Sequence, residues 1–346
     1  MTTTAPPSRS SRRTAYWILA LLFAGVLLYL SLRGIRWTEV WHILSHANGV
    51  LIACSVAVAS FALFMRAVRW RVLLRAGAPV TVSTAFWATA AGYFGNNFLP
   101  ARAGEVIRTL IVSRASGLSK TFVLTTALSE RMCDAISLVL ISSIVLLALP
   151  VKPGWFAHAA TPFAILGLSG ACGIIILPKI QRFCHRCLHL LPLSSELKTK
   201  LLGILDQVLV GMRSFHNFKR VSAFIGLTAV IWFSDAVGTI LSMRALGLPG
   251  TLPTALLVVT GLGLGSALPS TPGYVGIYQF VAVSVLTPFG FSKTDAIAYI
   301  LLAQAVQYAL ITFWGALGMA RSPGIRLRQA IREDGALPSS IPGEVV

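Results

Sequence analysis

Two short stretches decide the fold: residues 99–106, which read LPARAGEV, and residues 268–275, which read LPSTPGYV. Leu, Pro, Gly and Val recur at the same places in both, and an Arg-Ala pair precedes each, at residues 75–76 and 244–245. A related sequence follows each stretch, GLSKT at 117–121 and GFSKT at 290–294. Because Pro and Gly interrupt helices, both stretches predict breaks in an otherwise helical chain.

Apolar segments surround the two stretches along almost the whole chain. Of the 346 residues, 55% are apolar and only 12% are charged, whereas a soluble domain carries about 25% charged residues. This composition excludes a soluble enzyme, a disordered protein and a disulfide-stapled secreted domain. We predict an all-α polytopic integral membrane protein with a membrane domain over residues 15–320, a disordered cytoplasmic tail at 1–14 and a second cytoplasmic tail at 321–346.

Six apolar segments are long enough to be full spans, and two regions are not. The shorter regions, around residues 84–98 and 276–286, adjoin the two repeated stretches and are too short for about 30 Å of hydrocarbon. They predict re-entrant helical hairpins, which makes eight membrane elements if both are counted as spans. The six predicted full spans are residues 16–32, 50–65, 121–149, 156–177, 221–243 and 296–319.

Basic residues give the orientation. The formal net charge is +18, and apolar runs of this length exclude a nucleic-acid binder as its cause. With both termini in the cytoplasm, 23 of the 29 Lys and Arg residues fall on the cytoplasmic side and five fall outside. The positive-inside rule requires such an excess.

This orientation makes the two copies an inverted-topology repeat. The first, about 50–149, begins outside, and the second, about 221–319, begins inside. Secondary transporters place their sites between such repeats, at interrupted segments in corresponding positions. Chance recurrence of Leu-Pro and Gly in a chain rich in Gly and Pro is the alternative.

The first stretch predicts an anion-binding element. Arg102 and Arg108 add positive charge, and the planar guanidinium suits a phosphate. Asn97 adds an amide, and Glu105 can pair with either arginine. The alternative is an interfacial loop with solvated charges, and we interpret the basic cluster upstream, which begins at Arg66 and Arg69, as a positive-inside anchor.

Acidic residues inside predicted spans form a second group. Glu130 and Asp134 share one helix face, and Arg131 neighbours Asp134 at a spacing of three. Ionisable groups in a membrane are costly and indicate function, so this group predicts gating or proton coupling, with a structural ion-pair cluster as the alternative. Asp235, mid-span in another helix, is expected to pair with Arg102, Arg108 or Arg131 or to take part in the same gating or proton coupling, with interhelical glue as the alternative.

The second stretch is polar without formal charge. Thr271, Tyr274 and Gln279 offer hydrogen bonds, and Gly273 keeps the backbone open, so we predict that they contact substrate opposite the charged stretch. No nucleophile–base pair, metal-binding pattern or nucleotide loop is visible. We therefore expect no enzymatic activity, no cofactor and no metal.

These motifs resemble the flippase-like membrane domain family, which is related to the membrane part of lysylphosphatidylglycerol synthases. The resemblance rests on the Arg69-Trp70 turn, on residues 97–105 with Arg108, on Glu130-Arg131 with Asp134, and on residues 269–276. It implies a bacterial or archaeal cytoplasmic-membrane protein that handles lipids. The soluble aminoacyl-transferase domain of the synthases is not found in this sequence.

The sequence thus predicts a flippase that moves an anionic phospholipid or lipid-linked phosphate between leaflets without ATP. Two alternatives stay open. One is an ion or small-solute secondary transporter, and the other is an accessory subunit of a membrane glycosyl- or acyltransferase complex. The membrane and its lipids are the expected partners, nucleic acid is not, and protein partners are undetermined.

Overall fold

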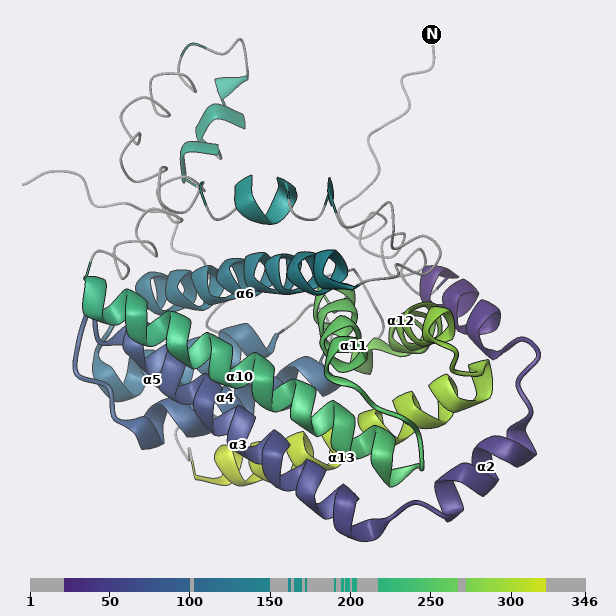
Figure 1. Ribbon diagram of the computed structural model, residues 1–346. Helices are drawn as coiled ribbons and strands as arrows, with labels where there is room; N and C mark the ends of the chain where they lie inside the picture. Colours follow the sequence, from purple (N-terminus) through teal and green to yellow (C-terminus); the bar gives the residue numbers. More distant parts are fainter. Residues whose placement is uncertain are drawn as a thin grey trace, which may run out of the picture.

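The computed structural model describes residues 22–99, 103–149, 217–266 and 272–321, with short pieces between 161 and 203. All regular secondary structure in these described ranges is helical, so the predicted all-α class is confirmed (Figure 1). The predicted tails, 1–14 and most of 321–346, and the predicted site residues Arg102 and Thr271 lie outside the described residues.

Four helices are long and apolar enough to cross a membrane: α3 (Gly49–Leu74), α6 (Lys120–Ala148), α10 (Phe218–Ala245) and α13 (Lys293–Ala320). At about 1.5 Å per residue each exceeds the hydrocarbon thickness. They coincide with four of the six predicted full spans. Of the other two, the first is represented by the helical residues Leu22–Leu32, and 156–177 lies mostly outside the described residues.

Side chains at the helix starts define where these four helices begin. Asn48 accepts hydrogen bonds from the first N–H groups of α3, and Asn217 does the same for α10. Ser119 caps α6, and Ser292 forms a capping box with Asp295 in α13. Such caps satisfy N–H groups that have no partner within the helix, so the GLSKT and GFSKT sequences are helix-start signals.

The shorter helices form two hairpins. Helix α4 (Val82–Phe98) packs against α5 (Gly104–Ser116), and α11 (Leu252–Gly265) packs against α12 (Ile277–Leu286). The 3-10 turns η3 (Pro272–Tyr274) and η4 (Thr287–Phe289) flank α12, and α2 (Trp37–Ser45) precedes α3. Helix continuity ends at both repeated stretches, as their Pro and Gly residues predict.

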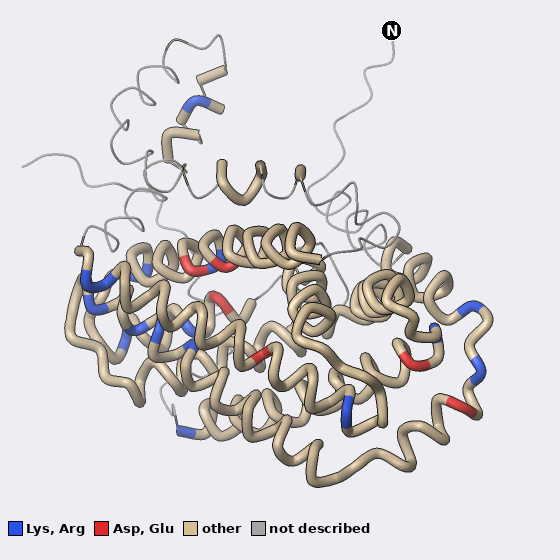
Figure 2. Tube along the Cα trace, in the orientation of Figure 1, with Lys and Arg blue, Asp and Glu red and all other residues tan. Residues whose placement is uncertain are grey.

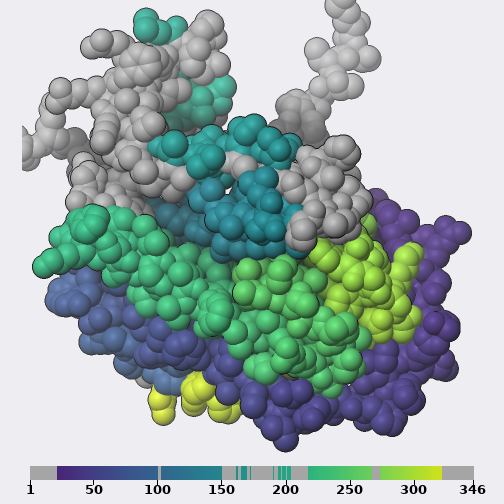
Figure 3. All heavy atoms as spheres, viewed as in Figure 1, coloured from purple at the N-terminus to yellow at the C-terminus, as the bar shows by residue number. Residues whose placement is uncertain are grey.

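Helices α3 and α10 pack closely along their length and run antiparallel. The Asn48 N–H donates to the Ala245 carbonyl at 2.8 Å, and the Ser55 and Ser242 hydroxyls lie 2.9 Å apart. Towards the other end, Arg69 reaches Thr228 at 3.1 Å, so residue numbers rise along one helix as they fall along the other. The pair lies side by side along the face in Figure 3.

Helices of the first half of the chain (α3 to α6, residues 49–148) pack crosswise on helices of the second half (α10 to α13, residues 218–320). Helix α6 packs on α11, and α13 packs on α4, so each half supplies a long helix to the hairpin of the other. One apolar core forms where α11, α12 and α13 meet, and another where α3, α4, α5 and α6 meet. Lys and Arg gather at the end of the molecule where α3 ends and α10 begins (Figure 2).

Candidate functional site

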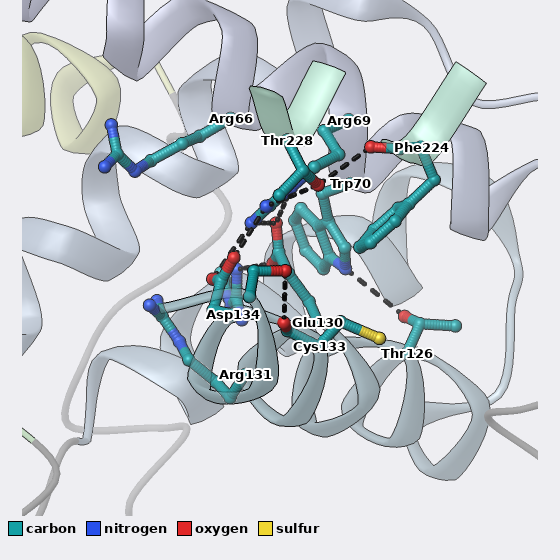
Figure 4. Close-up of polar contacts among 12 residues, drawn as sticks. Arg66, Arg69, Trp70, Thr126, Glu130, Arg131, Cys133, Asp134, Phe224 and Thr228 are labelled. Atoms are coloured by element: carbon teal, nitrogen blue, oxygen red, sulfur yellow. Dashed lines mark hydrogen bonds and ion pairs between the residues drawn. The ribbon is translucent and has the colours of Figure 1, made fainter. Parts of the chain in front are cut away.

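An arginine from α3 lies between the two carboxylates of α6. Arg69 Nη1 donates to Asp134 Oδ1 at 2.6 Å, and Nη2 donates to Glu130 Oε1 at 3.0 Å (Figure 4). Only 1% of the Arg69 side chain is exposed. One guanidinium thus supplies the counter-charge that two neighbouring carboxylates in a low-dielectric interior require.

The network continues through the first hairpin. Arg108 Nη1 donates to Glu130 Oε2 at 3.0 Å, and its Nε donates to Glu105 Oε2 at 2.5 Å. Arg131 Nε donates to Glu105 Oε1 at 3.2 Å. Three arginines and three carboxylates therefore alternate, and their formal charges cancel. The inner members Arg69, Glu130, Arg108 and Glu105 each have two partners, whereas the end members Asp134 and Arg131 each have one. The inner members therefore couple the contacts on either side of them.

This geometry corrects two sequence-based interpretations. Arg69 is a buried ion-pair centre, so its interpretation as a solvated positive-inside anchor is wrong. Arg131 bonds Glu105, and Asp134 bonds Arg69 instead of its neighbour in the helix. The predicted pairing of Glu105 with Arg108 is confirmed. The overlooked signal was the Arg66–Arg69 spacing of three, which places two guanidinium groups on one face of an apolar helix.

A separate ion pair joins the two halves. Arg66 donates to both Asp235 oxygens, with Nη2–Oδ2 at 2.5 Å and Nη1–Oδ1 at 3.3 Å. The Arg66 guanidinium also lies over the Trp232 ring, 5.6 Å from its centroid, and in Figure 4 it points away from the Arg69 cluster. Asp235 was expected to pair with Arg102, Arg108 or Arg131, and within the described residues its partner is Arg66. Arg66 and Asp235 each lie nine positions before the arginine of an Arg-Ala pair.

The second hairpin has a neutral counterpart of the charged network. Gln279 Nε2 donates to Gln304 Oε1 at 2.6 Å, and Gln304 Nε2 donates to the Gly273 carbonyl at 3.2 Å. The Gly276 N–H donates to Gln279 Oε1 at 2.7 Å. The Tyr274 ring stacks on Tyr278, with centroids 5.0 Å apart. Amides replace guanidinium and carboxylate groups, as the uncharged stretch predicts.

The repeated glycine of the two stretches has a steric cause in both places. A Cβ on Gly104 would lie 1.8 Å from the Gly92 carbonyl oxygen, and one on Gly273 would lie 1.1 Å from the Tyr308 hydroxyl. Gly273 also has a φ of 73°, which side-chain-bearing residues rarely adopt. The first hairpin therefore needs glycine for close backbone packing, and the second needs it for the positive φ.

A cavity of about 360 Å³ lies between these elements and is lined by both halves. Of the predicted site residues that the structure describes, Arg108, Glu130 and Gln279 are absent from its wall. Arg108 and Gln279 hydrogen-bond the wall residues Glu105 and Gln304, and Glu130 bonds Arg108. Arg66 and several tyrosines join the wall although the sequence did not mark them as site residues. The charged and polar wall includes Arg66, Tyr93, Asn96, Asn97, Glu105, Arg131, Asp134, Asp235, Thr239, Gly273, Tyr274, Gln304 and Gln307.

Exchanging the members of the cross-half pair tests whether their contact holds the halves together. We expect Arg66→Asp or Asp235→Arg alone to lower the free energy of unfolding by about 3 kcal/mol, because each places like charges in contact at side chains that are mostly buried. The double exchange should recover most of the loss. The free energy of unfolding is measured by adding increasing SDS to the protein in mild detergent and following tryptophan fluorescence. A double variant no more stable than the singles would contradict the assignment.

Comparison with known proteins agrees with this architecture. The family described as lysylphosphatidylglycerol synthase TM region matches residues 17–315. The chain is also 24% identical over 331 residues to a glycosyltransferase, AglD, of Haloferax volcanii, covering 86% of this chain. It spans about half, 52%, of that relative's length. By the extent of the family match, the chain belongs to the family of lysylphosphatidylglycerol synthase transmembrane regions.

Proposed function

We propose that this protein moves an anionic lipid or lipid-linked phosphate between the leaflets of a bacterial or archaeal cytoplasmic membrane without ATP. One observation carries the proposal: a cavity walled by charged and hydrogen-bonding groups lies within a bundle of membrane-crossing helices, between the two hairpins. Polar groups at membrane depth are expensive unless they line a wet path or serve a function. The head group would cross through this cavity while the acyl chains stay in the lipid.

The charges in the wall define how a head group would be held. Arg66 and Arg131 present guanidinium groups to the cavity, and both can exchange a carboxylate for a phosphate. We assign head-group binding to Arg66 and Arg131, together with Asn97, Tyr274 and Gly273, which line the same cavity. Arg102 and Thr271 keep this role on the sequence alone, and Arg108 acts by holding Glu105.

We infer that Asp134 and Asp235 gate this path or carry protons. Both carboxylates line the cavity, and each is bound by one arginine of α3. When a phosphate takes Arg66, the released Asp235 must find a proton or a cation, and Asp134 lines the same cavity. Glu130, which is buried behind the wall, holds Arg69 and Arg108 in place.

We further infer an inverted-topology repeat. The helices follow the same order in each half, and α3 and α10 run antiparallel. In addition, α6 and α13 each pack on the hairpin of the other half, and Arg66 and Asp235 occupy equivalent positions. Such repeats rock against each other around a fixed site. The gathering of Lys and Arg at one end of the bundle supports a cytoplasmic orientation of that end and of both termini (Figure 2).

A second candidate function is support of a membrane transferase. The relative AglD bears the name of a glycosyltransferase and is about twice as long as the matched region. A chain like this one would then serve as the membrane part beside a catalytic domain. In that case substitutions in the cavity wall change assembly with the transferase and leave lipid movement unaffected.

Lipid movement in proteoliposomes tests the proposal. We expect vesicles with the full chain to expose fluorescent, head-group-labelled phosphatidylglycerol from the inner leaflet to dithionite faster than protein-free vesicles. Arg131→Ala should slow this at least about tenfold, because a hydrogen bond to a charged group contributes about 1.5–3 kcal/mol. Glu105 keeps Arg108 as a partner in this variant, so the fold should persist.

Arg244→Ala is the matched control for this assay. Arg244 is an exposed arginine at the end of α10 and is absent from the cavity wall. It should move lipid at the rate of the unchanged protein. No acceleration over protein-free vesicles would refute lipid movement, and ion flux without lipid movement would favour the small-solute transporter.

A further inference from the structure

A groove separate from the cavity lies on the outside of the bundle. It has a volume of about 620 Å³, is formed by α3, α4 and the end of α13, and shares no lining residue with the cavity. Aromatic rings make up most of its wall, with one basic residue at the rim. The residues that matter here are Phe61, Phe64, Phe86, Trp87, Trp314 and Arg321.

The aromatic wall faces the surroundings and is preformed. Phe61 and Phe64 are 48% and 39% exposed. Phe86 packs edge-on against Trp314, with ring centroids 5.5 Å apart, and against Trp87 at 4.9 Å. Exposed aromatic surface on a membrane-spanning bundle contacts acyl chains, and mutual ring packing holds this surface in shape.

The indole of Trp314 is not arranged as an ordinary interfacial anchor. Interfacial tryptophans keep an apolar ring in lipid and direct the N–H to water or head groups. Here Trp314 Nε1 donates to the Ser60 hydroxyl of α3 at 3.2 Å. Because this donor is used inside the protein, the ring serves as a fixed wall of the groove.

Arg321 gives the groove a positive rim. Its guanidinium lies over the Trp87 ring, 4.7 Å from the centroid, directly after the last residue of α13. Arg66, Arg69, Arg108 and Arg131 all have carboxylate partners, whereas within the described ranges no carboxylate pairs with Arg321. Its side chain is exposed and lines the groove, where an external anion can reach it.

The start of α4 adds to the same positive rim. Val82 and Ser83, the first residues of α4, also line the groove. The Thr81 side chain accepts the Thr84 N–H, whereas the N–H groups of Val82 and Ser83 have no acceptor within the helix. The helix dipole places partial positive charge at this end. A guanidinium and a helix N-terminus thus border one apolar groove, at the level where α13 ends.

We infer that this groove binds one anionic phospholipid of the surrounding leaflet, with its phosphate at Arg321 and the start of α4 and one acyl chain along the aromatic wall. The charge of the rim selects an anionic head group, and the apolar wall selects a lipid over a soluble phosphate. By the proposed orientation this is the cytoplasmic leaflet, which is rich in anionic lipid. The bound lipid holds the end of α13 against α3 and α4, and this role does not depend on lipid transport.

Quenching of tryptophan fluorescence by brominated lipids tests the site. The full chain is reconstituted in phosphatidylcholine nanodiscs that contain equal mole fractions of brominated phosphatidylglycerol or brominated phosphatidylcholine. We expect the brominated phosphatidylglycerol to bind roughly fivefold more tightly than the brominated phosphatidylcholine, because one basic residue contributes about 1 kcal/mol to the binding of an anionic lipid. Arg321→Ala should remove this preference, and Trp314→Phe should remove much of the quenched signal.

Two controls separate this site from general surface charge. Arg244→Ala removes an exposed arginine elsewhere, and Trp41→Phe removes a tryptophan that is 73% exposed in α2. Both should retain the preference. Equal quenching by the two lipids in the unchanged protein, or a preference that survives Arg321→Ala, would overturn the inference. If brominated lipids do not quench Trp314 at all, the groove is covered by protein. If inorganic phosphate reverses the quenching by brominated phosphatidylglycerol, the site binds anions without requiring a lipid. Either result would also overturn the inference.

Discussion

Arg69→Ala should abolish the stable fold. The substitution leaves buried Asp134 without its arginine partner and takes one of two arginines from buried Glu130, which keeps Arg108. Breaking a single buried pair costs about 3–5 kcal/mol, and most proteins are stable by only about 5–15 kcal/mol. Arg69→Lys should recover only part of the loss, because an ammonium cannot bridge two carboxylates with the planar geometry of guanidinium.

The measurement is the yield of monodisperse protein in mild detergent, followed by SDS unfolding of whatever folds. Arg75→Ala is the matched control, because Arg75 directly follows the same helix, is exposed and belongs to the same basic cluster. It should behave like the unchanged protein. If Arg69→Ala were as stable as this control, the network would not be structural and its charges would be solvated.

Gly104→Ala should prevent the first hairpin from closing. The added methyl group would lie 1.8 Å from the Gly92 carbonyl oxygen and also crowd the Asn96 side chain at 2.6 Å. A backbone carbonyl cannot rotate away, so α4 and α5 must separate. We expect a loss of about 3 kcal/mol, the upper part of the range for overpacking, and a disturbed cavity wall, because Asn96 and Glu105 both lie in it.

Gly226→Ala gives the control for this prediction. Gly226 lies within α10, and a Cβ there would have no heavy atom within 4 Å. Because alanine favours helix over glycine by about 0.5–1 kcal/mol, this variant should be as stable as the unchanged protein or slightly more so. For both variants, the SDS concentration at which half of the protein is unfolded and the rate of lipid movement in proteoliposomes are measured. A Gly104→Ala protein with unchanged midpoint and rate would show that the hairpin tolerates separation.

Sequence reasoning located four of the five charged residues that line the cavity, all except Arg66, and mispaired two of them. Glu105 and Arg108, which lie one helical turn apart, were paired correctly because local spacing limits their choice. The partners of Asp235 and Asp134 were missed, because 169 and 65 residues separate them from Arg66 and Arg69. Sequence spacing says nothing about which helices become neighbours at that distance.

What the sequence alone determined is the all-helical membrane class and the two helix breaks. Both depend on local chemistry: apolar length against hydrocarbon thickness, and Pro and Gly against helix continuity. Only the tertiary structure decided that α3 lies antiparallel to α10 and that Arg69 serves two carboxylates of α6. The physical reason is that an arginine in an apolar helix must find a counter-charge, and several carboxylates satisfy that need equally until packing brings one within reach.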